Sequence, residues 1–270
     1  MKKILLIAGH GKKYNGTYDP GAVSIFGEEA KFARELVTLV QQSIGSCIPV
    51  EVYDQDKNCY SYSQAGYAPD YKAYDIVVEI HFNAKVKKDE SGDGQYTGIG
   101  AYTHPNNPGK EIAKDIVSAV TALGFKRWQI CSSTGLYNLK QAQKVGTSYL
   151  LLETAFLDDG DDMNWYNSNK RKVAKAIAQV LIQTAKESGT ANILSSSDAA
   201  SNEGCEPAFR VQVKRSNLYI RKGPGTSYKK NGYCPIGVYH IVETRAAEGY
   251  TWGRLKSGAG WIALEYAKRL

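Results

Sequence analysis

Long apolar runs are missing from this sequence. No segment approaches the roughly 20 consecutive apolar residues that a membrane span requires. The N-terminus begins with two lysines and a short apolar run, but Gly9 and His10 interrupt that run before it reaches the length of a signal peptide. We therefore expect a protein that is made in the cytoplasm without an export signal and does not insert into a membrane.

Cysteine is scarce and shows no pattern. The chain has five cysteines, an odd number, and no two of them form a CxxC pair. This arrangement argues against a disulfide framework and against a thiolate metal cage. We expect the ordinary thiols of a reducing cytoplasm at all five positions, which are Cys47, Cys59, Cys131, Cys205 and Cys234.

Charge and composition divide the chain. Residues 188–206 are rich in Ser, Ala, Gly and Asn and lack an apolar period, as a linker does. Residues 207–270 hold 12 Lys and Arg against three Asp and Glu, a net charge of +9. Because the whole chain carries +7, the first 206 residues carry −2. The sequence thus predicts a larger domain over residues 1–187, a linker over 188–206 and a small basic domain over 207–270.

The two predicted domains differ in their patterns of apolar and turn-forming residues. In residues 1–187 apolar runs alternate with amphipathic stretches, which is typical of an α/β fold whose mostly parallel sheet is flanked by helices. Residues 207–270 instead show short alternating runs broken by Gly, Pro and Asn, which indicates a small all-β barrel. The main predicted strands cover residues 3–8, 75–81 and 149–153, and the main predicted helices cover 29–44, 108–123 and 169–186.

Two of the four histidines lie at the ends of predicted strands. His10 follows the first strand and His81 closes the second, while Glu153 closes the third. Ligands of open α/β sheets gather at the carboxyl ends of the strands. Each residue taken alone reads as an ordinary hydrogen-bonded or solvent-exposed side chain, but the matching positions favour a shared site.

A carboxylate at the start of a helix completes this set. Glu28 and Glu29 both stand at the start of the predicted helix over residues 29–44, where the helix dipole favours negative charge. The residues alone do not distinguish the two. A hydrolytic zinc ion needs three nitrogen or oxygen ligands, an open position for water and a nearby carboxylate. The residues that supply those groups are His10, one of the two glutamates, His81 and Glu153.

Several motifs in order carry a family resemblance. The sequence is similar to the zinc-dependent N-acetylmuramoyl-L-alanine amidases at GHGK (9–12), DPGA (19–22), EIHFNA (79–84) and LLETAFLDD (151–159). The resemblance implies that Zn²⁺ is held by His10, Glu29 and His81, and that Glu153 is the catalytic carboxylate. Asn83, in the same motif as His81, is a candidate substrate-binding residue.

The resemblance also implies a reaction. The protein would hydrolyse the amide between N-acetylmuramic acid and L-alanine in bacterial peptidoglycan, with zinc activating the water and Glu153 carrying the proton. Glu79 shares a strand face with His81, and either orients that histidine or is an alternative ligand. Two rival functions stay open, a zinc peptidase of similar fold that cuts peptidoglycan peptides and a wall-binding protein without activity.

The basic domain has a resemblance of its own. Its runs NLYIRKGPGTSYKKNG and WGRLKSGAGWI are similar to the bacterial SH3-like domains of wall hydrolases. Tyr219, Tyr228 and Trp252 are candidate wall-binding residues, although Trp252 and Trp261 fit a small core equally well. The charge of +9 favours anionic wall polymers as partners, and no recognition motif for nucleic acid accompanies it. We expect a hydrolase of the phage endolysin or autolysin type that acts on the cell wall after its release.

Overall fold

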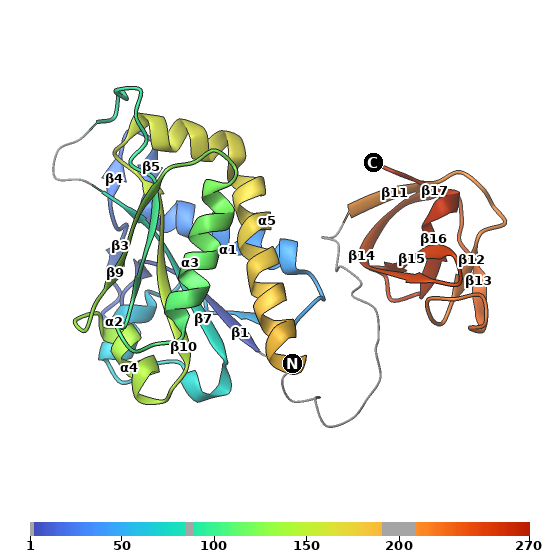
Figure 1. Cartoon of the computed structure of the whole chain (residues 1–270), viewed down its shortest axis with the longest axis horizontal. Helices are drawn as coiled ribbons and strands as arrows, with labels where there is room; N and C mark the ends of the chain where they lie inside the picture. The colour runs from blue at the N-terminus through green and yellow to red at the C-terminus, as the bar shows by residue number, and fades with distance from the viewer. Residues whose placement is uncertain (1–2, 85–88, 191–208) are drawn as a thin grey trace. The chain divides into compact units, whose positions relative to one another are not determined.

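The computed structural model describes residues 3–84, 89–190 and 209–270. The chain forms two compact units; among the described residues, the larger holds most of those up to position 190 and the smaller holds 209–270 (Figure 1). The predicted linker over residues 188–206 lies outside the described residues from position 191 onward. Its first three residues belong to the last helix of the larger unit, which ends at Thr190.

The larger unit is built on a six-stranded sheet (Figure 1). The strands, in spatial order, are β6 (Val50–Val52), β1 (Ile4–Ala8), β7 (Ile76–Asn83), β10 (Ser148–Phe156), β8 (Ile99–Thr103) and β9 (Arg127–Ser132). The first four are parallel to one another, whereas β8 is antiparallel to β10 and β9 runs parallel to β8. The predicted mostly parallel sheet is confirmed, and the reversed pair β8 and β9 is an addition that the strand pattern did not predict.

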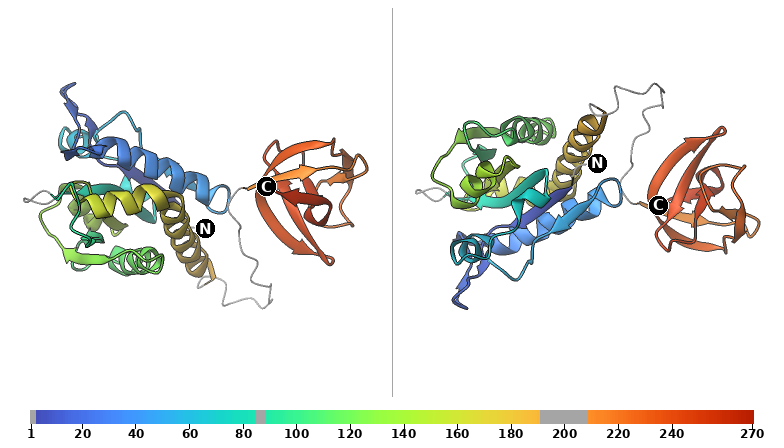
Figure 2. Two further views of the ribbon diagram at one scale, coloured as in Figure 1. Left: turned by 90° about the horizontal axis from the view of Figure 1, so that it is seen from above. Right: turned by 90° about the horizontal axis from the view of Figure 1, so that it is seen from below.

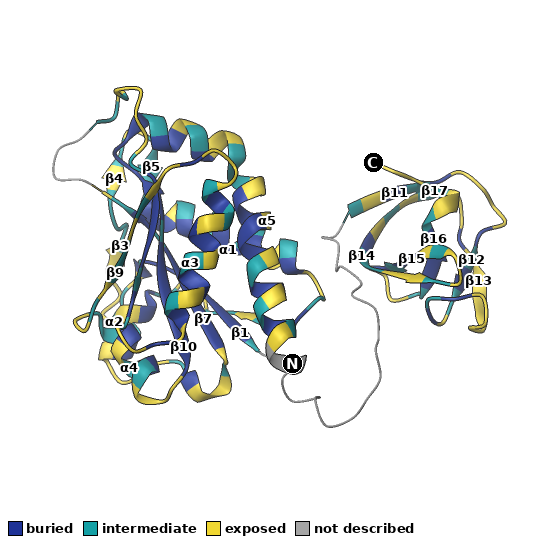
Figure 3. Ribbon diagram, viewed as in Figure 1, coloured by how far each residue is buried: buried dark blue, intermediate teal, exposed yellow. Residues whose placement is uncertain are grey.

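Helices cover both faces of this sheet, so most residues of its central strands are buried (Figures 2 and 3). On one face, Phe82 of β7 meets Phe32 of α1 (Glu29–Ile44) and Tyr166 of α5 (Gly160–Thr190), with ring centroids 5.5 and 4.9 Å away. The opposite face carries a buried cluster to which α2 (Cys59–Gln64) and α4 (Tyr137–Lys144) contribute. That cluster consists of Leu5, Ile7, Cys59, Tyr71, Val77, Leu139, Ala142 and Tyr149.

Most of the predicted helices are confirmed. Helix α1 has the predicted bounds, and α3 (Gly109–Thr121) lies within the predicted range 108–123. Helix α5 begins at Gly160, well before the predicted start at residue 169. Its first turn carries Asp161 and Asp162, which the helix dipole stabilises although their polarity hides the apolar period.

The smaller unit is a seven-stranded antiparallel sheet, which confirms its all-β class. Eight residues, among them Val213, Ile241 and Ile262, form its main buried cluster. Trp252 and Trp261 are both buried and pack together with Ala263. The strands, in spatial order, are β13 (Lys230–Tyr233), β12 (Tyr219–Arg221), β16 (Trp261–Ala263), β15 (Tyr250–Leu255), β14 (Gly237–Ala247), β11 (Phe209–Val213) and β17 (Ala267–Arg269).

The cysteines correct one prediction. Cys59, Cys131 and Cys234 are free thiols, as expected. Cys47 is disulfide-bonded, so the prediction of an ordinary thiol is wrong at this position. Spacing along the chain does not reveal which cysteines meet in space, because a disulfide depends on the distance and direction of the two side chains. Cys205 lies outside the described residues.

No helix in the described part of the chain combines the length and the apolar character needed to cross a membrane.

Candidate active site

Three predicted site residues lie at one edge of the central sheet. His10 follows β1, His81 lies near the end of β7, and Glu153 lies on β10. The register places Glu153 directly beside His81. The carboxyl ends of parallel strands share an edge of the sheet, so strand pairing alone brings these residues together.

The turn after β1 aims the imidazole of His10. His10 has a φ of 62°, a left-handed conformation that few residues other than glycine adopt. Two neighbouring glycines leave space for the site. A Cβ on Gly9 would lie 2.3 Å from the His81 ring, and a Cβ on Gly21 would lie 2.6 Å from Glu29 Oε2. This strained backbone is held only because the surrounding contacts fix it.

Arg34 of α1 supplies much of that fixation. Its half-buried guanidinium donates to the carbonyl oxygens of Gly9 and His10, at 3.0 Å each, and to those of Ala30 at 2.7 Å and Gln55 at 2.5 Å. A guanidinium presents several donors in a rigid fork, which suits this convergence of carbonyl groups. Arg34 therefore connects the His10 turn to the helix that carries Glu29.

Glu29 is the carboxylate that reaches both histidines. It is the first residue of α1 and is only 5% exposed. Its Oε1 lies 2.8 Å from His81 Nδ1 and accepts the Phe82 N–H at 3.0 Å. Its Oε2 lies 3.1 Å from His10 Nε2 and accepts the Ala22 N–H at 2.9 Å. The donor atoms of His10, Glu29 and His81 all lie within 4.8 Å of one another.

Glu28 points elsewhere. Its carboxylate accepts from Lys31 Nζ at 3.0 Å and from the Tyr18 hydroxyl at 2.9 Å. The side chains of the two glutamates that the sequence left equivalent thus point in different directions at the start of the helix. Glu29 is the one that faces the histidines.

The second nitrogen of each histidine faces an outer carboxylate. His10 Nδ1 lies 3.2 Å from Asp19 Oδ2. Asp19 is itself held by the backbone N–H of Gly21 at 3.1 Å and by the side-chain amide of Asn58 at 3.0 Å. A carboxylate behind a histidine fixes its tautomer and ring orientation.

His81 has a matching partner. Its Nε2 lies 3.5 Å from Glu79 Oε1, which confirms that the two residues share a strand face. Glu79 is buried and accepts from the Tyr149 hydroxyl and, at 3.4 Å, from the Asn138 amide. Both histidines thus lie between Glu29 and an anchored outer carboxylate.

The pKa values of these groups are shifted because imidazole rings and carboxylates alternate in the site. Burial alone would raise the pKa of Glu29, but the hydrogen bonds to His10 and His81 hold that pKa far below its usual range. Burial would lower the pKa of His81, yet the hydrogen bonds to Glu29 and Glu79 raise it well above the usual value. The same balance of burial against Glu29 raises the pKa of His10. The cluster is therefore strongly attractive to positive charge.

Glu153 has a different environment from Glu29. Its Oε2 is buried and has no hydrogen-bond partner among the described residues. Burial raises the pKa of Glu153 to about 7, against the opposing effect of the nearby His81. A carboxyl group with such a pKa exchanges protons readily near neutral pH, as general acid–base catalysis requires.

A cavity of ≈340 Å³ opens beside the two histidines. Asp19 and Glu79 line it, and none of the lysines or arginines among the described residues does. Asn138 also faces this space, and its buried Oδ1 has no hydrogen-bond partner in the described structure. The other lining residues are His10, Asn58, Tyr60, His81, Gly135, Leu136, Tyr137, Leu139 and Leu151.

The sequence missed several supporting residues. Asn83, like Glu29 and Glu153, is not among the residues that line the cavity, and its amide oxygen accepts the Ala84 N–H at 2.8 Å. Arg34, Asn138 and Tyr149 carry no local signal that marks them as partners of the site. Asp19 stands in the DPGA motif, which is the signal that points to it.

The chain belongs to the N-acetylmuramoyl-L-alanine amidase family, whose model matches residues 4–183. A relative at the level of sequence is a probable autolysin of Staphylococcus aureus, 30% identical over 193 residues. That match covers 66% of this chain and only 37% of the autolysin, so this chain corresponds to little more than a third of that relative.

Solved structures share the fold of the larger unit. The CwlD amidase of Clostridioides difficile, solved in complex with the GerS lipoprotein, is 19% identical with a TM-score of 0.55. That similarity covers 69% of this chain and 100% of the amidase. The catalytic domain of the CD27L endolysin, which targets Clostridia difficile, is also 19% identical, with a TM-score of 0.54 over 68% of this chain and 98% of that domain.

Arg34→Met should destabilise the larger unit. The substitution keeps the length of the side chain but leaves four carbonyl groups without their charged donor, which costs about 3 kcal/mol of unfolding free energy. Urea denaturation measures the loss. Arg171→Met, at an exposed position on α5, is the matched control and should change the stability by less than about 0.5 kcal/mol. Equal losses in the two variants would contradict the role given to Arg34.

Proposed function

We propose that the larger unit is a zinc-dependent amidase that hydrolyses the bond between N-acetylmuramic acid and L-alanine in peptidoglycan. The observation that carries this proposal is the convergence of His10, Glu29 and His81 beside Glu153 at one edge of the sheet. The family membership of residues 4–183 supports the same reaction.

The donor set suits zinc. Two imidazole nitrogens and one carboxylate oxygen are a common ligand set for a catalytic zinc ion, which keeps its fourth position for water. The outer carboxylates Asp19 and Glu79 would fix the tautomer and the ring orientation that ligation requires. His10, Glu29 and His81 would hold the ion. Bound there, zinc supplies a Lewis acid for the amide carbonyl and lowers the pKa of water.

Glu153 would move the protons of the reaction. Its free, buried Oε2 takes a proton from the attacking water and passes it to the nitrogen of the leaving alanine. The cavity beside the histidines holds the part of the substrate next to the scissile amide. Its lining offers the unpaired Oδ1 of Asn138 as a hydrogen-bond acceptor. Since no lysine or arginine in the described part of the chain lines it, the cavity favours a neutral group over an anion.

The smaller unit would bind the wall. We assign residues 1–187 to the catalytic domain, 188–206 to a linker and 207–270 to a bacterial SH3-like domain. The charge of +9 draws this domain to a polyanionic wall. Of its candidate contacts, Tyr219 and Trp252 line a cleft, whereas the ring of Tyr228 packs over Gly223 and Gly225.

The proposed biological role is that of an endolysin or autolysin, which reaches the wall after its release from the cytoplasm. The match to a probable autolysin and the shared fold with an endolysin catalytic domain support this class of enzyme.

Glu153→Ala should lower the turnover of wall fragments by more than about 100-fold, because the proton carrier is lost. Metal analysis of the purified variant should still find about one zinc per chain. Glu111→Ala, at an exposed position on α3, should keep full activity. If zinc disappears together with activity, Glu153 is a ligand and the proposed role is wrong.

Removal of the metal tests the reaction class. A chelator should stop the clearing of wall suspensions, and zinc should restore it. Analysis of the products should find new amino-terminal alanine. Other new amino termini would identify a peptidase of similar fold, and clearing that continues with the chelator would contradict a metal mechanism.

Glu79→Gln should weaken zinc binding by roughly 10- to 100-fold, since the charge behind His81 is lost. Competition with a chromophoric chelator measures the dissociation constant. Tyr149→Phe, which removes a hydrogen bond to Glu79, should weaken binding less. Glu51→Gln, on the edge strand β6, controls for the loss of one charge and should leave zinc affinity unchanged. Unchanged affinity in Glu79→Gln would show that Glu79 does not position the ligand.

A further inference from the structure

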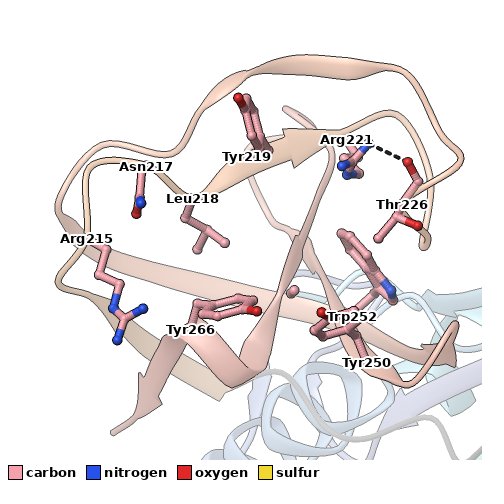
Figure 4. A pocket seen from close by; sticks show the side chains of 10 residues that line it. Arg215, Asn217, Leu218, Tyr219, Arg221, Thr226, Tyr250, Trp252 and Tyr266 are labelled. Carbon is pink, nitrogen blue, oxygen red and sulfur yellow. Dashed lines mark hydrogen bonds between the residues drawn. The ribbon is translucent and has the colours of Figure 1, made fainter.

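The smaller unit contains a cleft of ≈340 Å³ that is separate from the site described above (Figure 4). Leu218, Trp252 and Ala263 are buried residues that give it an apolar base. Ten residues line the cleft, and none of them is acidic: Arg215, Asn217, Leu218, Tyr219, Arg221, Thr226, Tyr250, Trp252, Ala263 and Tyr266.

Two guanidinium groups stand at opposite ends of the ring of side chains in Figure 4. Arg221 donates from Nη1 to the carbonyl oxygens of Thr226 and Tyr228, at 2.6 and 2.8 Å, so it is fixed in place. Arg215 is exposed and forms neither an ion pair nor a hydrogen bond within the described residues. Its guanidinium carbon lies 5.9 Å from the centroid of the Tyr266 ring.

The acidic residues of this unit do not neutralise Arg215. Glu243 pairs with Arg245 and Arg254, at 2.8 and 2.9 Å. Glu248 accepts from Thr226 and Ser227, and Glu265 accepts the Thr251 N–H. All three acidic side chains of residues 207–270 therefore have partners other than Arg215. An unpaired guanidinium beside an aromatic ring at the end of a concave cleft is suited to an incoming anion.

The aromatic walls restrict which anion fits. Tyr219, Tyr250, Trp252 and Tyr266 all line the cleft, and Figure 4 shows Tyr250, Trp252 and Tyr266 along its lower side. Such walls gain from contact with methyl groups and flat amide groups. A polyol phosphate chain has little apolar surface to bury there, and an open row of cations would serve it better than a concave apolar cleft. A short peptide with small apolar side chains and a free carboxylate satisfies both the walls and Arg215.

We propose that this cleft binds a short peptide of the bacterial wall by its free carboxylate, with Arg215 as the anion partner and the tyrosine and tryptophan rings around the small side chains. This inference rests on the proposed wall-binding function of the smaller unit and names its ligand class.

Binding of the full chain to purified walls tests the proposal. The chain carries Glu153→Ala so that it leaves the walls intact, and the walls are ones that the active chain clears. Arg215→Ala should weaken binding about tenfold, which is the effect of losing one charge-assisted hydrogen bond. Arg210→Ala removes an equal charge at an exposed position on β11, outside the cleft, and should weaken binding less than twofold.

Two treated walls identify the ligand. Amidation of the wall carboxyl groups with ammonia and a carbodiimide should weaken parental binding and abolish the difference between the two variants. Removal of phosphate polymers with hydrofluoric acid should leave the tenfold difference in place. If the difference instead survives amidation and vanishes with the phosphate, the ligand is a phosphate polymer and the peptide proposal is wrong.

The two levels of proposal fail in different ways. Equal losses of binding in Arg215→Ala and Arg210→Ala, with firm parental binding, would refute the cleft proposal and indicate that the smaller unit binds the wall through diffuse charge. If the parent binds no wall, both the cleft proposal and the wall-binding proposal are wrong.

Discussion

The carboxylate of Glu29 holds the candidate site together. It accepts two backbone N–H groups, from Ala22 and Phe82, and faces one nitrogen of each histidine. A buried carboxylate is costly unless such partners compensate it. The segment between β1 and α1 therefore has to fold over the end of the sheet, because the N–H of Ala22 and the ring of His10 reach Glu29 only from there.

Helix α1 is the element that makes this possible. Its first residue is Glu29, and Arg34, a little more than one turn later, binds the backbone of Gly9 and His10. One rigid helix thus carries both the carboxylate that faces the histidines and the cation that fixes the turn before them. The left-handed backbone of His10 persists because these contacts act from two sides.

Sequence reasoning recovered the parts of the structure that have a local signal. The apolar period of α1 predicted its bounds, and the alignment of strand ends placed His10, His81 and Glu153 at one edge. The choice of Glu29 over Glu28 came from family resemblance, since both fit a helix start. Non-local features stayed hidden. The four carbonyl groups around Arg34 come from three segments of the chain, and nothing in the sequence of β8 reveals its reversed direction.

The acidity of the catalytic cavity bears on how products leave. Glu29, Asp19 and Glu79 together carry a charge of −3 when ionised, one more than a single divalent ion neutralises. Hydrolysis converts a neutral amide into an ammonium and a carboxylate. No lysine or arginine of the described residues lines the cavity, so a carboxylate formed there is bound less favourably than the neutral group that preceded it. The charge that orients the imidazoles would thus also weaken the binding of the acid product.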